Sequence, residues 1–299
     1  MKCQAPCMIS GTSSFSTGIF NTFTQNNPYI YSVFADGQIA FDRNTNKVVN
    51  VIETDEYEET VNTLRDFNQK GYIPSWMATD TDSSKQNECV KTNDYGVRNA
   101  GVYPDYESFW KATYGFEGKY LQLSDILLDR DGALGSAYAV PVYSTKAEAA
   151  VKFLELLETD KTVGDFALYG VKDKNYQVDS DGSITKIADS GYSFPAYAVN
   201  SLLNASLLKG QDPSFYESVK KFVEDETVSP LFGFSFDSSK VDAELAAIKE
   251  VASGYSLLNT GDMDVDKVLP EYRGALKEAG IDRVIEEAQR QIDEYLQSK

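Results

Sequence analysis

Two consecutive apolar stripes at helical spacing constrain the fold most, and they lie in residues 145–171, TKAEAAVKFLELLETDKTVGDFALYGV. In the first stripe apolar side chains stand at positions i, i+3, i+4 and i+7, which predicts a helix with one core-facing side; they are Ala150, Phe153, Leu154 and Leu157. Thr145 and Glu148 have the spacing of a capping box at its start. We therefore expect Phe153 to be core, and truncating it to alanine to cost about 3 to 5 kcal/mol if the side chain is fully buried.

A second helix is expected after a tight corner in the same stretch. Thr159 or Asp160 can cap its start, and Gly170 can close it in a left-handed conformation. Its apolar face is formed by Val163, Phe166 and Ala167. The sequence thus predicts two packed amphipathic helices here, whose own task is capping and packing.

Further helical signals dominate the second half of the chain, while the few predicted strands lie mainly before residue 190. The other predicted helices begin at Asp55, Pro104, Asp212 and Asp237 or cover 196–209, 270–279 and 281–297. Two β-hairpins are expected, 39–41 with 48–52 and 176–178 with 183–187, together with a strand near 95–102. The polar run 79–88 predicts a loop. This pattern indicates a helix-rich α/β protein.

Composition excludes several kinds of chemistry. The chain has no histidine, which removes Ser-His-Asp and Cys-His catalysis and every histidine-ligated metal centre. Its formal net charge of −18 repels phosphate backbones, so nucleic acid is not an expected partner. No apolar run reaches the length of about 18 residues that would span a membrane, and the first residues do not form a signal peptide.

Cysteines and clustered carboxylates do not indicate a metal site either. The three cysteines, Cys3, Cys7 and Cys89, are an odd number without a second CxxC-like pair; free thiols are the simplest reading, and a Cys3–Cys7 bridge stays open. Two Asp-x-Asp-Gly runs resemble calcium loops, but their twelfth positions are Tyr138 and Ala188, where a bidentate Glu is required. We expect neither a metal nor a cofactor.

Four segments in order resemble one family: residues 50–71, residues 145–178, VSPLFGFSFD at 228–237, and the ending LPEYRGALKEAGIDRVIEEAQRQIDEYL. Together they are similar to the extracellular solute-binding proteins of ABC sugar importers, in the LipO-like lipoprotein subgroup with the DUF3502 C-terminal domain. The resemblance implies a periplasmic-binding-protein-like (type II) α/β fold with an incomplete first lobe. It also implies a carbohydrate ligand, the transmembrane permease subunits of an ABC importer as partners, and an extracellular location with only indirect membrane contact.

Three segments of different character follow from this resemblance. Residues 1–35 are expected to be an irregular N-terminal remnant, 36–190 an α/β lobe, and 191–299 a helical, DUF3502-like domain. The sequence departs from the family pattern at its start, where Cys3 and Cys7 follow no apolar segment and so do not match the acylated cysteine. It departs again at 196–202, where a Trp-Met-Phe-Gly-Asn-Gln-Phe type segment is replaced by AYAVNSL.

Sugar-binding proteins hold their ligands by stacking aromatic rings on C–H surfaces and by hydrogen bonds from side chains such as Asp and Asn. The best candidates are aromatic residues in loops near Gly or Pro, because loops carry ligand contacts more often than helix faces do. The predicted ligand-binding residues are Trp76, Tyr192, Phe194, Tyr197 and Asn200. Each single aromatic residue is more often part of a core.

Two other functions stay open. A carboxylate-dependent glycosidase needs only two acidic side chains and no histidine, yet none of the 46 acids stands out in a motif. A shortened surface or interaction protein without transport activity is the other alternative. The preferred interpretation is a non-catalytic carbohydrate-binding protein.

Overall fold

The computed structural model describes residues 5–8, 28–30, 34, 37–79, 84–98, 104, 106–122, 127–128, 138–192, 194 and 202–299. The chain forms two compact units: unit 1 comprises Met1–Gly101, Leu121–Ala133 and Glu226–Lys299, and unit 2 comprises Val102–Tyr120 and Leu134–Asp225. Each unit is assembled from separate stretches of sequence, whereas the segments 1–35, 36–190 and 191–299 are continuous. That three-part division stays a prediction. No described helix is long and apolar enough to cross a membrane.

Unit 1 contains an antiparallel three-stranded sheet of β2 (Tyr29–Ile30), β3 (Ile39–Asp42) and β4 (Lys47–Asn50), in the order β2-β3-β4. Asp42 fixes the turn between β3 and β4, because its carboxylate accepts hydrogen bonds from Asn44 N at 2.8 Å and Thr45 Oγ1 at 2.7 Å. The predicted hairpin is confirmed, but its second strand ends at Asn50. Residues Val51–Glu53 form a 3-10 turn, η1, that buries Val51 and Ile52.

Helix α2 (Asp55–Gln69) begins as the sequence predicted. Thr54 caps it by accepting from Tyr57 N, and Tyr57, Val61 and Leu64 are buried on one face. Gly71 follows the helix end with φ +70°.

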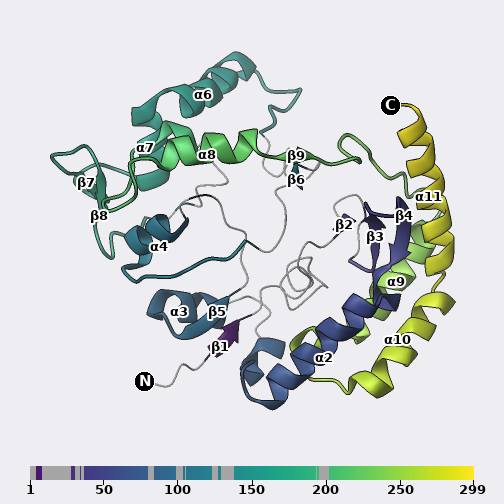
Figure 1. Cartoon of the computed structure of the whole chain (residues 1–299). Helices are drawn as coiled ribbons and strands as arrows, with labels where there is room; N and C mark the ends of the chain where they lie inside the picture. The colour runs from purple at the N-terminus through teal and green to yellow at the C-terminus, as the bar shows by residue number, and fades with distance from the viewer. Residues whose placement is uncertain are drawn as a thin grey trace. The chain divides into compact units, whose positions relative to one another are not determined.

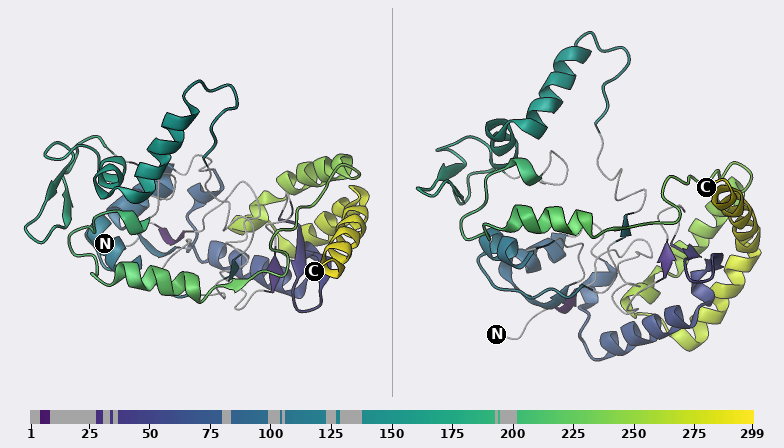
Figure 2. Two further views of the ribbon diagram at one scale, coloured as in Figure 1. Left: turned by 90° about the horizontal axis from the view of Figure 1, so that it is seen from above. Right: turned by 45° about the horizontal axis from the view of Figure 1, so that its top comes forward.

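Three C-terminal helices complete the core of unit 1: α9 (Asp242–Gly254), α10 (Val265–Glu278) and α11 (Ile281–Gln297). Figure 1 and both views in Figure 2 show them beside the sheet and α2. The bounds of α11 match the prediction residue for residue. Helix α10 begins before the predicted 270, because Asp264 caps it by accepting from Lys267 N and Pro270 is accommodated inside.

The remaining described parts of unit 1 are smaller. They are η2 (Ser75–Ala78), α3 (Ser84–Thr92), η5 (Ser256–Thr260) and two parallel strand pairs, β1 (Ala5–Met8) with β5 (Tyr95–Arg98) and β6 (Leu127–Leu128) with β9 (Thr227–Val228). The predicted loop at 79–88 is wrong for 84–88, which belong to α3. Burial of Cys89 and Val90 anchors this otherwise polar helix.

Unit 2 contains α4 (Tyr106–Tyr114), α6 (Ala147–Thr159), α7 (Lys161–Tyr169), α8 (Phe215–Glu224) and the hairpin of β7 (Tyr176–Val178) and β8 (Ile184–Lys186). The hairpin is confirmed. The helix predicted at 196–209 is wrong over its described part, where η4 (Leu202–Asn204) is followed by a bridge and a turn. Helix α8 begins after Ser214, and the Asp212 carboxylate accepts from Ser214 N in the preceding turn.

In helix α6 the expected burial of Phe153 is wrong. Leu157 is buried, but Phe153 is 55% exposed, so the apolar stripe does not predict its burial. The capping box is also wrong, because the helix begins at Ala147 after Lys146 and has no side-chain cap bond. The nearest side-chain contact is that of Ser144, whose hydroxyl accepts from Lys146 N at 3.2 Å.

Helix α7 begins as expected and buries a different face. Asp160 caps it by accepting from Thr162 N at 2.9 Å and Val163 N at 3.0 Å. Phe166, which lies on the predicted apolar face, is 59% exposed, whereas Leu168 is buried. Gly170 has a positive φ of +88°, but its ψ of −144° lies outside the left-handed helical region.

Replacing Asp160 with alanine is expected to destabilise unit 2 by about 1 kcal/mol, because two amide groups of the first turn of α7 lose their acceptor. Thr145→Ala is the control, since this residue makes no cap bond to α6 and should change the free energy of unfolding by no more than about 0.5 kcal/mol. Urea unfolding measures both variants. Equal losses would contradict the assignment of the cap to Asp160.

Candidate ligand-binding site

Trp76, the predicted ligand residue of unit 1, lies in η2, and this turn begins directly after Pro74. Its ring is half-buried against a small cluster of Leu64, Ile73 and Met77. The Nζ atom of Lys85 stands 6.0 Å from the ring centroid. Trp76 therefore combines packing with a partly exposed indole.

Tyr192 and Phe194 belong to unit 2 and expose large aromatic surfaces, 39% and 47% of their residue areas. The Tyr192 hydroxyl donates to Ala167 O at 2.6 Å, which fixes the phenol against α7. Tyr197 and Asn200 lie outside the described residues. The structure thus brings Tyr192 and Phe194 to the surface of unit 2, and Trp76 belongs to unit 1.

The chain before Tyr192 is attached to the end of α7 by one side chain that the sequence reasoning missed. Asn175 accepts from Val171 N at 2.9 Å through Oδ1 and donates from Nδ2 to Ser190 O at 3.2 Å. A Cβ on Gly170 would stand 2.6 Å from this Asn175 Oδ1. Glycine at 170 therefore leaves the room that Asn175 needs.

The chain that returns to α7 after residue 201 is attached through a buried carboxylate. Asp165, only 8% exposed, accepts from Ser206 N at 2.6 Å and from Ser206 Oγ at 2.7 Å. Tyr169 adds a bond from its hydroxyl to Ser206 O at 2.6 Å. An acid among apolar residues of a predicted helix was the available signal for Asp165, because a buried carboxylate requires hydrogen-bond partners.

A hollow of about 490 Å³ lies beside α4 in unit 2. Its charged lining residues pair with one another, Lys111 with Glu117 at 2.7 Å and Lys119 with Glu107 at 3.0 Å. Hydrogen bonds from these lysines hold the pKa of each glutamate below its usual value. The hollow is therefore lined by equal numbers of positive and negative side chains, and no sequence motif indicated it.

Among the described residues, no group of three His, Cys, Asp or Glu side chains is arranged to hold a metal ion. Of the two Asp-x-Asp-Gly runs, the one at 129–132 lies outside the described residues. In the one at 179–182, Asp179 accepts from Thr185 Oγ1 at 2.6 Å and Asp181 accepts from Ser183 Oγ at 2.7 Å, so both carboxylates stabilise the β7–β8 turn.

Residues 230–297 match the family model DUF3502, described as a domain of unknown function. The chain is also 27% identical over 270 residues to a carbohydrate ABC transporter substrate-binding protein of Streptococcus pneumoniae serotype 4, covering 87% of this chain and 54% of the relative. The predicted resemblance is confirmed. We refer to residues 230–297 as the DUF3502 region.

Solved structures show which fold the chain shares. The N-glycan transport solute-binding protein NgtS of Streptococcus pneumoniae superposes with a TM-score of 0.80 at 22% identity, covering 98% of this chain and 64% of NgtS. NgtS in complex with Man5GlcNAc gives a TM-score of 0.79 at 22% identity, covering 99% of this chain and 64% of that chain. The predicted solute-binding fold class is confirmed. The chain spans about half the length of the curated relative and under two thirds of NgtS.

Proposed function

We propose that this protein binds an oligosaccharide outside the cell and delivers it, chemically unchanged, to the transmembrane permease of an ABC importer. The observation that carries the proposal is the superposition on NgtS over 98% of the chain. The relative that is 27% identical is itself named as a carbohydrate ABC transporter substrate-binding protein. Man5GlcNAc, the sugar in one NgtS complex, is the reasonable first ligand to test.

The proposed ligand contacts are Trp76, Tyr192, Phe194, Tyr197 and Asn200. Phe194 supports this role because nearly half of its area is exposed, which leaves an aromatic face available for stacking on a sugar. Tyr192 supports it because its hydroxyl is already bound to Ala167 O, so the ring is held in place before a ligand arrives. Ordered aromatic faces of this kind lose little entropy when a sugar stacks on them.

Titration of the chain with Man5GlcNAc is expected to release heat and to raise the Tm, since a ligand that binds the folded state stabilises it. Mannose serves as the comparison, because a single sugar ring covers fewer contacts and should bind more weakly. Chromatography of the recovered sugar should show no cleavage. Absence of both heat and a Tm shift across a panel of oligosaccharides would overturn the proposal, and a cleaved product would favour a glycosidase.

Phe194→Ala in the same titration should weaken binding about two- to tenfold, the usual worth of one aromatic contact. Phe153→Ala is the matched control, since Phe153 is a similarly exposed phenylalanine of the same unit on α6. Equal affinities of the two variants would remove Phe194 from the site.

A further inference from the structure

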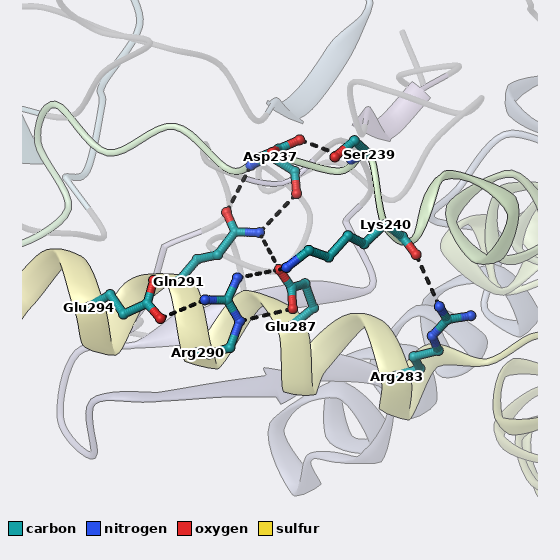
Figure 3. A network of polar contacts seen from close by, with 8 residues as sticks. All are labelled: Asp237, Ser239, Lys240, Arg283, Glu287, Arg290, Gln291 and Glu294. Atoms are coloured by element: carbon teal, nitrogen blue, oxygen red, sulfur yellow. Dashed lines mark hydrogen bonds and ion pairs between the residues drawn. The ribbon is translucent and has the colours of Figure 1, made fainter.

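Five side chains at four-residue intervals, four on α11 and one just beyond its end, all contact the irregular segment 230–240. We call these side chains the polar ridge; they are Arg283, Glu287, Gln291, Tyr295 and, just beyond the helix end, Lys299. Residues four apart are neighbours on a helix surface, so the ridge forms a continuous row that runs at an angle to the helix axis. Figure 3 shows its first three members facing Asp237 and Lys240.

The centre of the ridge binds main-chain atoms of the segment. Gln291 accepts from Asp237 N at 2.9 Å and donates to Asp237 O at 2.9 Å, so its amide group pairs with the peptide as a neighbouring strand would. The Tyr295 hydroxyl donates to Phe232 O. These bonds satisfy backbone groups that no sheet or helix satisfies.

The two ends of the ridge hold the two ends of the segment. Lys299 Nζ donates to Pro230 O at 2.9 Å. At the opposite end, Arg283 Nη2 donates to Lys240 O at 3.1 Å, and Lys240 Nζ lies 3.2 Å from Glu287 Oε1. The segment therefore runs antiparallel to α11.

Glu287 is kept charged by its neighbours on the helix. A hydrogen bond from Arg290 is the main cause of the lowered pKa of Glu287, and a bond from Gln291 Nε2 at 2.9 Å adds to it. Arg290 is in turn paired with Glu294 at 2.6 Å. Because exposed ion pairs contribute little, the main-chain bonds of Gln291 and Tyr295 are the more important ones.

Apolar packing supports the segment from within. Leu231 and Phe234 are buried in the core of unit 1, at 1% and 4% exposure. The ring of Phe234 lies 5.4 Å from that of Tyr295. Tyr295 thus joins the apolar and the polar contacts.

The segment begins just after the chain passes from unit 2 to unit 1, between Asp225 and Glu226. The DUF3502 region begins with this segment at 230 and ends with α11 at 297. Its first part is therefore bound by its last part.

We propose that the polar ridge is the anchor of segment 230–240, that this anchoring is the task of α11 within the DUF3502 region, and that it sets the affinity for the oligosaccharide without touching it. The affinity part rests on the proposed function. Gln291 and Tyr295 are accordingly positioning residues. The bonds to Asp237 and Phe232 fix the chain that enters unit 1, and a fixed connection lowers the entropy lost on binding.

Gln289 offers a matched control on the same helix. It accepts from Val48 N at 2.7 Å and donates to Asn46 O at 3.2 Å, the same amide-to-backbone pairing, but with the edge of β4. Gln289→Ala and Gln291→Ala therefore remove equivalent bonds at two different places. Tyr295→Phe is a second, milder ridge variant that keeps the ring packed on Phe234.

Hydrogen exchange and titration with Man5GlcNAc test the anchor together. Gln291→Ala should accelerate exchange of the Asp237 amide about two- to tenfold, and Gln289→Ala that of the Val48 amide instead. Only the Gln291 and Tyr295 variants should bind Man5GlcNAc more weakly than the unaltered chain. Unchanged exchange at Asp237 would overturn the anchor.

If exchange at Asp237 is faster in the Gln291 variant, yet the Gln289 and Gln291 variants bind Man5GlcNAc with the same affinity, the proposed effect of the anchor on ligand binding is overturned. If the unaltered chain binds no oligosaccharide, the proposed function and the affinity part fail, and exchange at Asp237 still decides the anchor.

Discussion

Replacing Gly261 with alanine is expected to destabilise unit 1 by about 2 to 5 kcal/mol, from left-handed backbone strain plus overpacking. Gly261 has φ +70°, and an added Cβ would stand 2.2 Å from Leu64 O and 2.9 Å from Arg65 N. These are main-chain atoms of α2, which cannot turn aside as a side-chain tip would. Either α2 or the chain after η5 must move.

Two hydrogen bonds oppose such a movement. Arg65 Nη1 donates to Gly261 O at 2.9 Å, and Asn68 Nδ2 donates to Thr260 O at 2.9 Å. Displacing the loop would stretch both, since they start from α2. We therefore expect the structure to relax little around the new methyl group.

Gly71→Ala is the control, because Gly71 has the same φ of +70° but nothing within 4 Å of an added Cβ. The Gly71→Ala variant should lose only about 1 to 2 kcal/mol of stability, the cost of backbone strain for alanine in the left-handed region. Urea unfolding in a Trp110→Phe background leaves Trp76 as the fluorescent probe of unit 1. Equal losses in the two alanine variants would show that the contact with α2 does not matter.

The elements that the sequence predicted well are those whose local signals agree. In α11 the apolar stripe and the glycine at 280 mark the same helix, and its buried residues Val284, Ala288 and Ile292 stand four residues apart. In the β3–β4 hairpin, turn residues separate two apolar runs. Local propensity and tertiary packing then favour the same structure.

Burial was predicted less well, because it depends on partners that lie far away in sequence. Phe153 and Phe166 lie on the predicted apolar stripes of helices that do form, yet both side chains are more than half exposed. A stripe shows which residues share a face and leaves open whether another element covers that face. The α3 helix was missed for the related reason that only two of its residues, Cys89 and Val90, are buried.

For the candidate site the sequence pointed to aromatic residues, whose role in ligand binding stays a prediction. Tyr192 and Phe194 follow from composition and turn signals, and both are exposed. The partners of Asp165, Asn175 and Gln291 were not predictable, because each side chain binds main-chain atoms or a serine many residues away. A contact to a main-chain atom can be made to a residue of any type, so the sequence does not identify the partner.

Phe41→Ala is expected to destabilise unit 1 by about 3 to 5 kcal/mol, the usual cost of a large-to-small substitution in a core. Phe41 is fully buried in β3, and β3 is bonded to β2 on one side and to β4 on the other. Because both neighbours hold the backbone in place, the cavity cannot close by a shift of the strand. The same Trp76 fluorescence probe measures the loss.

Phe153→Ala completes this experiment, because the same substitution is made where the side chain is exposed. The helical stripe alone predicts a cost equal to that of Phe41, whereas 55% exposure on α6 predicts a change within about 0.5 kcal/mol. Trp110, in a Trp76→Phe background, reports on unit 2 for this variant. A loss of several kcal/mol at Phe153 would mean that another surface covers α6 in solution, and a small loss at Phe41 would contradict the core described for unit 1.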